Sequence, residues 1–240
     1  MKKQVENRDF VLYSPDNLKV LNEEIIKILP EKLDFYKKIF KINDFRQVKI
    51  NLFDNLDDFR AFIHDLRGEK TSLPSYAIGT FDNGMINLYL DPKKTDILDK
   101  TYTITHELFH IMYKELILEK ENKERIIWFD EGMAKLFSGE NDYHQTDGKF
   151  NKFLDKFIDR NSSFPDLNTL KHGTFFETYE YSGYMQSFLA VKYLYDTLGE
   201  DDFLTLMHNI NDIKEYGKNI VPKALVYYKN LIKQGKTVNI

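Results

Sequence analysis

A chain of 240 residues can form one fair-sized domain or two small lobes, and its hydrophobic content of 42% supplies enough material for a core. The net charge is only −4, with Lys and Arg scattered among Asp and Glu, which excludes the basic face typical of nucleic-acid-binding proteins. The absence of cysteine excludes disulfides, thiolate metal sites and a cysteine nucleophile.

The N-terminal segment carries no apolar run of the length found in signal peptides. No later segment reaches the ~20 consecutive apolar residues that cross a bilayer. We therefore expect a cytoplasmic protein that has neither a membrane nor a nucleic acid as a partner.

The first hundred residues mix strand and helix patterns. Four short apolar runs predict strands, at residues 10–13, 48–52, 76–81 and 85–90. The last two flank Asp82-Asn83-Gly84, and Asn-Gly between alternating apolar runs is a strong hairpin signal. Helical spacing predicts one helix over 14–40, kinked or split at Pro30, and a second over 54–66 that ends near Gly68.

Beyond Thr95 the pattern is helical almost throughout. Helices are predicted over residues 99–119, 124–137, 147–160, 179–198, 200–210 and 211–234. The fold class is therefore α+β, with a small N-terminal mixed sheet and helices followed by a helical C-terminal lobe. We expect a single domain over 1–240, in which the lobes cover 1–120 and 121–240, and a polar loop over 141–147.

The segment His106-Glu107-Leu108-Phe109-His110 lies within the predicted helix over 99–119. Residues four apart share one face of a helix, so the two imidazoles can reach one metal ion at ~2.0–2.1 Å. Glu107 projects beside that metal, where its carboxylate can take a proton from water. A shuffled chain of this composition contains about 0.01 such motifs; histidines that merely pack in the core or lie on the surface are the competing interpretation.

A catalytic zinc needs three protein ligands and an open position, so a third ligand must come from another part of the chain. The best candidate is Glu131, in Trp128-Phe129-Asp130-Glu131-Gly132-Met133-Ala134 on the next predicted helix. Ala134 is small enough to let two helices approach closely. A solvated acid on an amphipathic helix is the alternative role for Glu131.

The other ionisable residues carry weaker signals. Asp130 is expected either to orient a metal-bound imidazole or to cap its own helix. The remaining histidines have no ligand spacing, and we expect them on the surface or in ordinary packing: His64, His144, His172 and His208.

The two segments HELFH and WFDEGMA together resemble the gluzincin metallopeptidases, especially the small peptidase-MA-like proteins related to the catalytic domain of aminopeptidase N. Those enzymes pair His-Glu-x-x-His with a downstream Trp-x-x-Glu-Gly-x-Ala helix whose Glu is the third zinc ligand. The resemblance implies one zinc ion held by His106, His110 and Glu131, with Glu107 as the general base. It also implies a zincin-like fold with an active-site cleft between the N-terminal and helical lobes.

Members of this family carry a tyrosine in a later helix that hydrogen-bonds the oxyanion of the tetrahedral intermediate. Tyr184 matches that position best, because its distance along the chain from Gly199-Glu200 is similar to the interval in aminopeptidase N-like enzymes. Tyr181, three residues earlier, is the alternate. Ordinary packing is the competing role for both, since the chain has 15 tyrosines.

Gly84-Met85-Ile86-Asn87 resembles the Gly-x-Met-Glu-Asn strand of aminopeptidases, whose backbone pairs with the substrate and whose Glu grips the substrate's free amine. Ile86 stands where that Glu should be, and an apolar side chain cannot hold an ammonium group. This departure favours internal cleavage. Gly84, Met85 and Asn87 remain candidate substrate-binding residues, on an edge strand over 85–90 that could pair with an extended peptide.

These patterns predict a zinc-dependent endopeptidase acting on a peptide or protein, in which Glu107 activates water and Tyr184 and the metal share the oxyanion charge. Three alternatives retain the zinc: a hydrolase acting on another kind of bond, a peptidase specific for a single protein, and a non-catalytic peptide-binding or regulatory protein. A helical interaction protein without metal is the fourth.

Overall fold

The computed structural model describes residues 2–68, 79–82, 84–91, 97–139, 150–171 and 176–236. The chain forms two compact units, Met1–Met112 and Tyr113–Ile240. The first combines a mixed sheet with helices, and the described part of the second is almost entirely helical. The predicted α+β class is therefore confirmed. The units divide at Met112, close to the end of the motif helix, whereas the sequence analysis placed the division between lobes at residue 120.

The first unit is built on a five-stranded sheet in the order β1-β2-β3-β5-β4. Its strands are β1 (Lys2–Glu6), β2 (Phe10–Ser14), β3 (Val48–Phe53), β4 (Gly79–Asp82) and β5 (Met85–Tyr89). β2, β3 and β5 run parallel, while β1 and β4 are antiparallel to their neighbours. The inner strand β3 is buried at nearly every position, as expected of a strand that is covered on both faces.

Two predictions about the strands were wrong. Four strands were expected, but the described residues form five, because the charged and exposed segment β1 pairs with β2. The turn between them is held by the Asn7 side chain, which accepts the backbone N–H groups of Asp9 and Phe10 at 2.9 Å. The segment over 85–90 was expected at an edge, but β5 lies between β3 and β4, and β4 ends the sheet.

The helical segments of the first unit are η1 (Asp16–Leu18), α1 (Lys19–Ile39), α2 (Leu56–Arg67) and α3 (Ile97–Tyr113). α1 continues through Pro30, so the predicted split does not occur. α2 begins where the Asn55 side chain accepts the N–H groups of Asp57 and Asp58, and it ends at Gly68, whose φ of +75° suits glycine.

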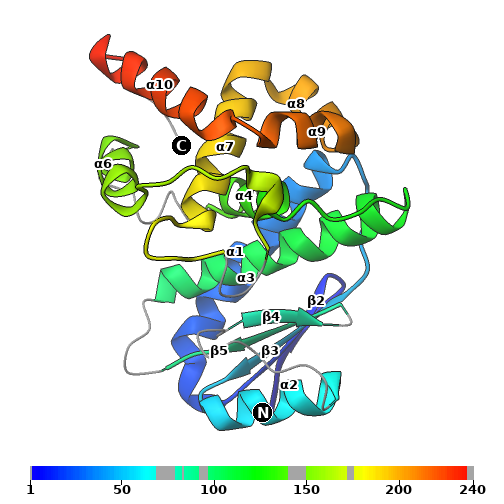
Figure 1. The fold of residues 1–240 in the computed structure, drawn as a ribbon. Helices are drawn as coiled ribbons and strands as arrows, with labels where there is room; N and C mark the ends of the chain where they lie inside the picture. The colour runs from blue at the N-terminus through cyan, green and yellow to red at the C-terminus, as the bar shows by residue number, and fades with distance from the viewer. Residues whose placement is uncertain are drawn as a thin grey trace. The chain divides into compact units, whose positions relative to one another are not determined.

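Different helices cover the two faces of this sheet (Figure 1). α2 packs on one face, where its Phe59 meets Phe53 of β3 with ring centroids 5.6 Å apart. Phe81 of β4 points to the opposite face and stacks on His110 of α3 at 5.8 Å. The motif helix therefore lies against the face opposite α2.

α1 anchors α3 just before its first motif histidine. The buried Tyr36 donates a hydrogen bond to the Thr105 carbonyl oxygen at 3.0 Å, and its ring meets Phe109 edge-on at 5.5 Å. Burial raises the pKa of Tyr36 far above its ordinary value, so the hydroxyl stays a donor. This contact fixes the backbone next to His106.

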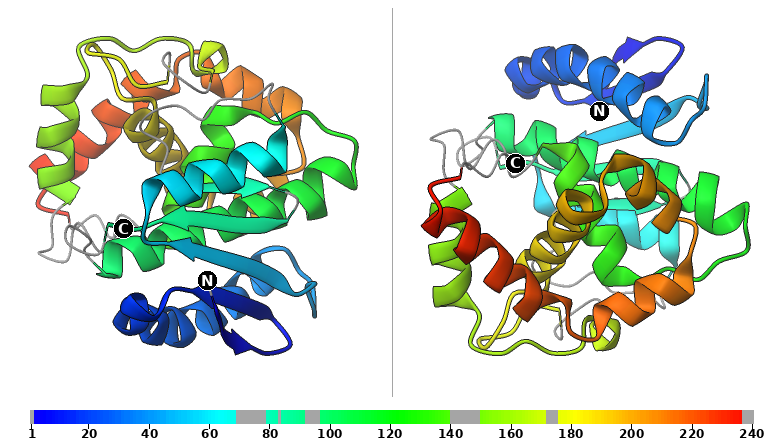
Figure 2. Two further views of the ribbon diagram at one scale, coloured as in Figure 1. Left: turned by 90° about the horizontal axis from the view of Figure 1, so that it is seen from below. Right: turned by 90° about the horizontal axis from the view of Figure 1, so that it is seen from above.

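The second unit is assembled around α7. Its helical segments are the π-helix η2 (Lys114–Glu119), α4 (Ile127–Ser138), α6 (Phe150–Arg160), η3 (Leu167–Thr169), α7 (Gly183–Leu198), α8 (Glu200–Leu206), α9 (Ile210–Gly217) and α10 (Ile220–Lys233). α7 contacts both α4 and α10 (Figure 2). The described helices of the whole chain include none with the continuous apolar length needed to cross a bilayer.

Several predicted helices have different limits in this unit; the one expected over 200–210, for example, ends at Leu206. The helix expected over 179–198 begins only at Gly183, because Ser182 accepts the N–H of Met185 at 3.2 Å and caps it. The segment over 211–234 is two helices, α9 and α10, separated after Gly217. Several expectations lie outside the described residues: the loop over 141–147, the hairpin residue Asn83, His144, His172, and the starts of the strand over 76–81 and the helix over 147–160.

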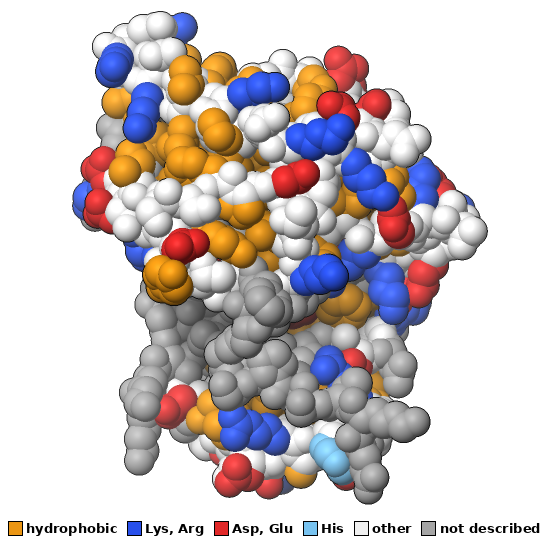
Figure 3. All heavy atoms as spheres, viewed as in Figure 1, with side chains coloured by type: hydrophobic (Ala, Val, Ile, Leu, Met, Phe, Trp, Pro, Cys, Tyr) orange, Lys and Arg blue, Asp and Glu red, His pale blue; other side chains and the backbone are white. Residues whose placement is uncertain are grey.

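Charged side chains of both signs are interspersed over the described second unit on the face drawn in Figure 3. Hydrophobic side chains lie among them. The exposed large hydrophobic residues of this unit include Ile158 and Val226, at 42% and 61%. The mixture on this face agrees with the scattered charge of the sequence.

Candidate metal centre

Helix α3 places His106 and His110 one turn apart, as their spacing predicted. Their Nε2 atoms lie 3.0 Å from each other, and the rings meet edge-on at 4.7 Å. The helix is anchored in the hydrophobic core by buried side chains, those of Leu108, Ile111 and Met112. The histidines are only 8% and 3% exposed, so two imidazole nitrogens converge within the protein rather than on its surface.

Residues of the sheet adjoin this part of α3. The Phe81 ring stacks on the His110 ring with an angle of 27° between their planes, which restrains the imidazole. Glu107 is less buried than the histidines, and its Oε1 lies 3.6 Å from the point a Cβ on Gly79 would occupy. The Glu107 carboxylate therefore lies beside β4, the strand that ends the sheet.

Helix α4 carries Glu131, which is 4% exposed. The next residue, Gly132, makes the close approach to α7: a Cβ there would lie 2.4 Å from the Ser187 carbonyl oxygen. Ala134, which was expected to allow such an approach, is fully buried. The orientation of Glu131 is thus tied to the packing of α4 on α7.

His106, His110 and Glu131 each offer one ligand atom, and these atoms lie within 4.8 Å of one another. Two imidazole nitrogens and a carboxylate oxygen suit several divalent ions. All three residues are buried. This group could hold a metal ion.

Asp130 and Glu131 share a cation that the sequence analysis did not single out. Arg125 precedes α4; its Nε donates to Asp130 Oδ2, and its Nη2 donates to Glu131 Oε1 at 3.0 Å. The N-cap position of α4 is Ile126, whose side chain makes no capping bond, and Asp130 lies within the first turn of the helix. No sequence rule marked Arg125: it falls in the predicted helix over 124–137, but it stands five and six residues before Asp130 and Glu131 rather than at the three- or four-residue spacing of helix neighbours. In the structure it precedes α4 and reaches Glu131 through the path of the backbone.

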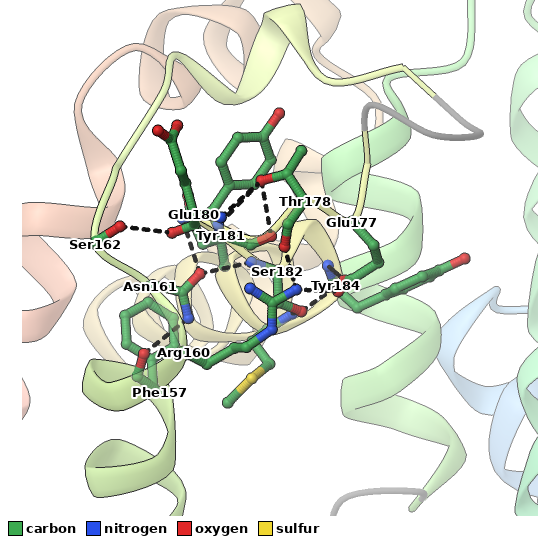
Figure 4. A network of polar contacts seen from close by, with 12 residues as sticks. Phe157, Arg160, Asn161, Ser162, Glu177, Thr178, Glu180, Tyr181, Ser182 and Tyr184 are labelled. Atoms are coloured by element: carbon green, nitrogen blue, oxygen red, sulfur yellow. Dashed lines mark hydrogen bonds and ion pairs between the residues drawn. The ribbon is translucent and has the colours of Figure 1, made fainter.

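A network of hydrogen bonds builds the start of α7, where Tyr184 lies (Figure 4). Ser182 donates to Glu177 Oε1 at 2.6 Å, and the same oxygen accepts the backbone N–H of Tyr184 at 3.3 Å. Asn161 Oδ1 accepts both the Ser182 N–H at 2.8 Å and the Gln186 side-chain amide at 3.0 Å. These bonds fix the first turn of the helix and hence the root of the Tyr184 side chain.

The two candidate tyrosines occupy different settings. Tyr184 is in the first turn of α7; its ring meets Phe176 edge-on at 4.6 Å, and Lys135 Nζ lies 5.5 Å from the ring centroid. Lys135 is one turn beyond Glu131 on α4, so Tyr184 lies beside the helix that carries the carboxylate. Tyr181 falls in the helix predicted over 179–198, but in the structure it precedes α7 and points in a different direction from Tyr184 (Figure 4).

The candidate substrate-binding residues lie around the β4–β5 turn. Gly84 has a φ of +70°, and Arg46 donates to its carbonyl oxygen at 3.3 Å. Asn87 is fully buried and accepts a bond from Asn51 at 2.8 Å, on the sheet face opposite Phe81. Met85 belongs to the same inner strand. Asn87 therefore points away from the side of the sheet that adjoins α3.

The described histidines outside the motif are at the surface, as expected. The His64 side chain is 60% exposed, 3.8 Å from Asp65. The His208 side chain is 48% exposed, and its Nδ1 lies 2.5 Å from Glu121 Oε1. Neither belongs to the group of metal-ligating atoms.

Comparisons with known proteins add no relative. Protein-family models give no match to this chain, and neither do the curated protein sequences. The chemistry of the site therefore carries the functional argument.

Proposed function

We propose that this protein is a zinc-dependent endopeptidase of the gluzincin type, with a zincin-like fold. The observation that supports the proposal is the buried grouping of donor atoms from His106, His110 and Glu131, with Glu107 following the first histidine. Two imidazoles and one carboxylate are a ligand set of catalytic zinc, which keeps a further position open.

The histidine geometry suits zinc. Two nitrogens bound to a tetrahedral zinc at ~2.0–2.1 Å lie about 3.3 Å apart. His106 Nε2 and His110 Nε2 are 3.0 Å apart, so a small separation of the rings would accommodate the ion. The carboxylate of Glu131 would supply negative charge in a buried setting where the ion loses its bulk water.

Zinc, when bound, would polarise the scissile carbonyl and lower the pKa of a water molecule. Glu107 would accept a proton from that water while the water oxygen bonds to the carbonyl carbon. The proton would then pass to the amide nitrogen as the carbon–nitrogen bond breaks, which returns Glu107 to its starting state. Tyr184 would donate a hydrogen bond to the carbonyl oxygen as negative charge develops there.

The position of Glu107 beside β4 supports an extended peptide as the substrate. β4 is the outermost strand of the sheet among the residues that the structure describes, and a peptide added to such a strand gains backbone hydrogen bonds. Glu107 Oε1 lies 3.6 Å from the point a Cβ on Gly79 of β4 would occupy, so a peptide added to this strand would pass the general base. Ile86 is buried and apolar, so it cannot bind the N-terminal ammonium group of a substrate as the Glu of aminopeptidases does. Its presence favours cleavage within a peptide.

Glu107→Gln provides the decisive experiment. The variant keeps the size of the side chain and both histidines but removes the base, so we expect normal zinc content and a loss of hydrolysis of about 10²–10⁴-fold. Zinc content is measured by elemental analysis, and cleavage by mass spectrometry of a diverse peptide mixture. Glu115→Gln, in the first turn of η2, which directly follows α3, is the matched control and should retain activity.

Two results would contradict the proposal. Hydrolysis that survives Glu107→Gln would remove the assigned base. A wild-type protein that binds zinc and peptides but cleaves none of them would instead favour a non-catalytic peptide-binding or regulatory role.

A further inference from the structure

Arg125 contacts two neighbouring carboxylates on α4. Its Nε donates to Asp130 and its Nη2 donates to Glu131 Oε1 at 3.0 Å. Asp130 and Glu131 are 2% and 4% exposed, whereas the Arg125 side chain is 30% exposed. The guanidinium thus reaches from the surface into a buried acidic pair.

Two carboxylates on consecutive buried residues repel each other, and each loses the solvation that would screen the repulsion. A guanidinium is permanently charged and offers several donors in one rigid plane. Arg125 uses two of these donors on two different side chains, so it offsets both charges and fixes the orientation of both groups at once. A surface ion pair between one Lys and one Glu would offset only one carboxylate charge and would fix its orientation weakly.

The contact to Glu131 also selects between its two oxygens. Arg125 engages Oε1, and a carboxylate has a second oxygen with which to bind a metal. Groups that hydrogen-bond a metal-ligating carboxylate orient it and tune its donor strength. Glu131 is a member of the buried group that could hold a metal ion, so such an effect would act directly on that group.

We propose that Arg125 is a positioning residue that sets the orientation of Glu131 for metal binding by bridging it to Asp130. The inference rests on the proposed metal site but not on peptide hydrolysis. It assigns a role to the two-donor geometry of the guanidinium and not merely to its charge. Arg125→Lys, which keeps the charge but replaces the planar fork with a point charge, separates these two contributions.

The experiment compares Zn²⁺ dissociation constants of the full chain by competition with a chromophoric chelator. We expect Arg125→Gln to weaken binding by about 10–100-fold, and Arg125→Lys to fall between it and the wild type. Lys192→Met is the control: Lys192 forms a buried ion pair with Asp196 on α7 at 2.8 Å, so its loss disturbs the same unit without touching Glu131. Its zinc affinity should match the wild type.

Co²⁺ provides a second readout, because its visible absorption reports the ligand geometry. We expect the spectrum to change in Arg125→Gln and to remain unchanged in Lys192→Met. A zinc affinity in Arg125→Gln equal to the wild type would overturn the proposal, as would a higher affinity, which would make Arg125 a competitor of the metal. Should Arg125→Gln fail to fold, Arg125→Lys decides, since full affinity there would rule out the two-donor role.

The outcomes also distinguish this inference from the proposed function. Zinc binding that depends on Arg125 without any peptide cleavage would overturn the peptidase and leave the positioning role intact. If cleavage and zinc binding are both unchanged in the Arg125 variants, the positioning role is overturned and the peptidase proposal stands. A wild-type chain without zinc affinity would overturn both.

Discussion

Replacing Gly132 with Ala tests whether the approach of α4 to α7 positions the proposed ligand Glu131. A Cβ at Gly132 would lie 2.4 Å from both the Ser187 carbonyl oxygen and Val191 Cγ2. Ordinary contact begins near 3.4 Å, so the helices would have to separate by about 1 Å. The obstruction includes backbone, which cannot rotate aside as a side chain can.

The sign of the effect follows from two opposing contributions. In a helix with open space, Gly→Ala stabilises by about 0.5–1 kcal/mol, because alanine loses less backbone entropy on folding. Overpacking of a buried site costs about 1–3 kcal/mol or more. We therefore expect Gly132→Ala to lower the free energy of unfolding by about 1–3 kcal/mol, and to weaken metal binding because Glu131 moves with α4.

Urea unfolding followed by tryptophan fluorescence provides the assay. Trp128 is the only tryptophan, is fully buried and lies on α4, so its emission reports the unit in question. Val191→Ala removes one of the two contacts, but the Ser187 carbonyl remains. Gly132→Ala should therefore still destabilise in the Val191→Ala background. A stabilising Gly132→Ala in the wild type, or a neutral one in that background, would refute the argument.

Two further predictions concern the tyrosines and a surface carboxylate. Tyr184→Phe should lower kcat for peptide cleavage by about 10²–10³-fold with little change in KM, while Tyr181→Phe should not; the opposite pattern would transfer the oxyanion role to Tyr181. Hydrogen bonds from Lys123 and His208 lower the pKa of Glu121. The ionised carboxylate therefore stabilises the fold at pH values above the ordinary Glu pKa of about 4.3, and this contribution is lost as the pH falls through the lowered pKa. Glu121→Gln should thus lower the free energy of unfolding in urea at pH 7, by at most about 1 kcal/mol for so exposed a pair, and the difference should shrink toward pH 3; a pH-independent difference would contradict it.

The site residues on α3 could be predicted from local spacing. A helical period puts His106 and His110 on one face whatever surrounds them, and both Nε2 atoms do converge. Arg125 could not be found in this way. Although the predicted helix over 124–137 includes it, Arg125 stands five and six residues before Asp130 and Glu131, outside the three- and four-residue spacing that links neighbours on a helix, and only the folded backbone brings its guanidinium to both.

The strand errors have a related cause. β1 is charged and exposed, so its sequence lacks apolar alternation, and pairing with β2 alone makes it a strand. β5 has the alternation that was recognised, but alternation is the same for an inner strand and an edge strand. Its place between β3 and β4 depends on long-range pairing.

The sequence by itself determined the α+β class, the motif helix and the identity of the metal-ligating candidates, because these depend on residue type and on spacing within a few turns. The tertiary structure decided which strand ends the sheet, where α7 begins, that Gly132 lets α4 meet α7, and that Arg125 bridges two buried carboxylates. Those features arise from contacts between residues distant in the chain or outside any repeating pattern, and the burial that makes them energetically important exists only in the folded protein.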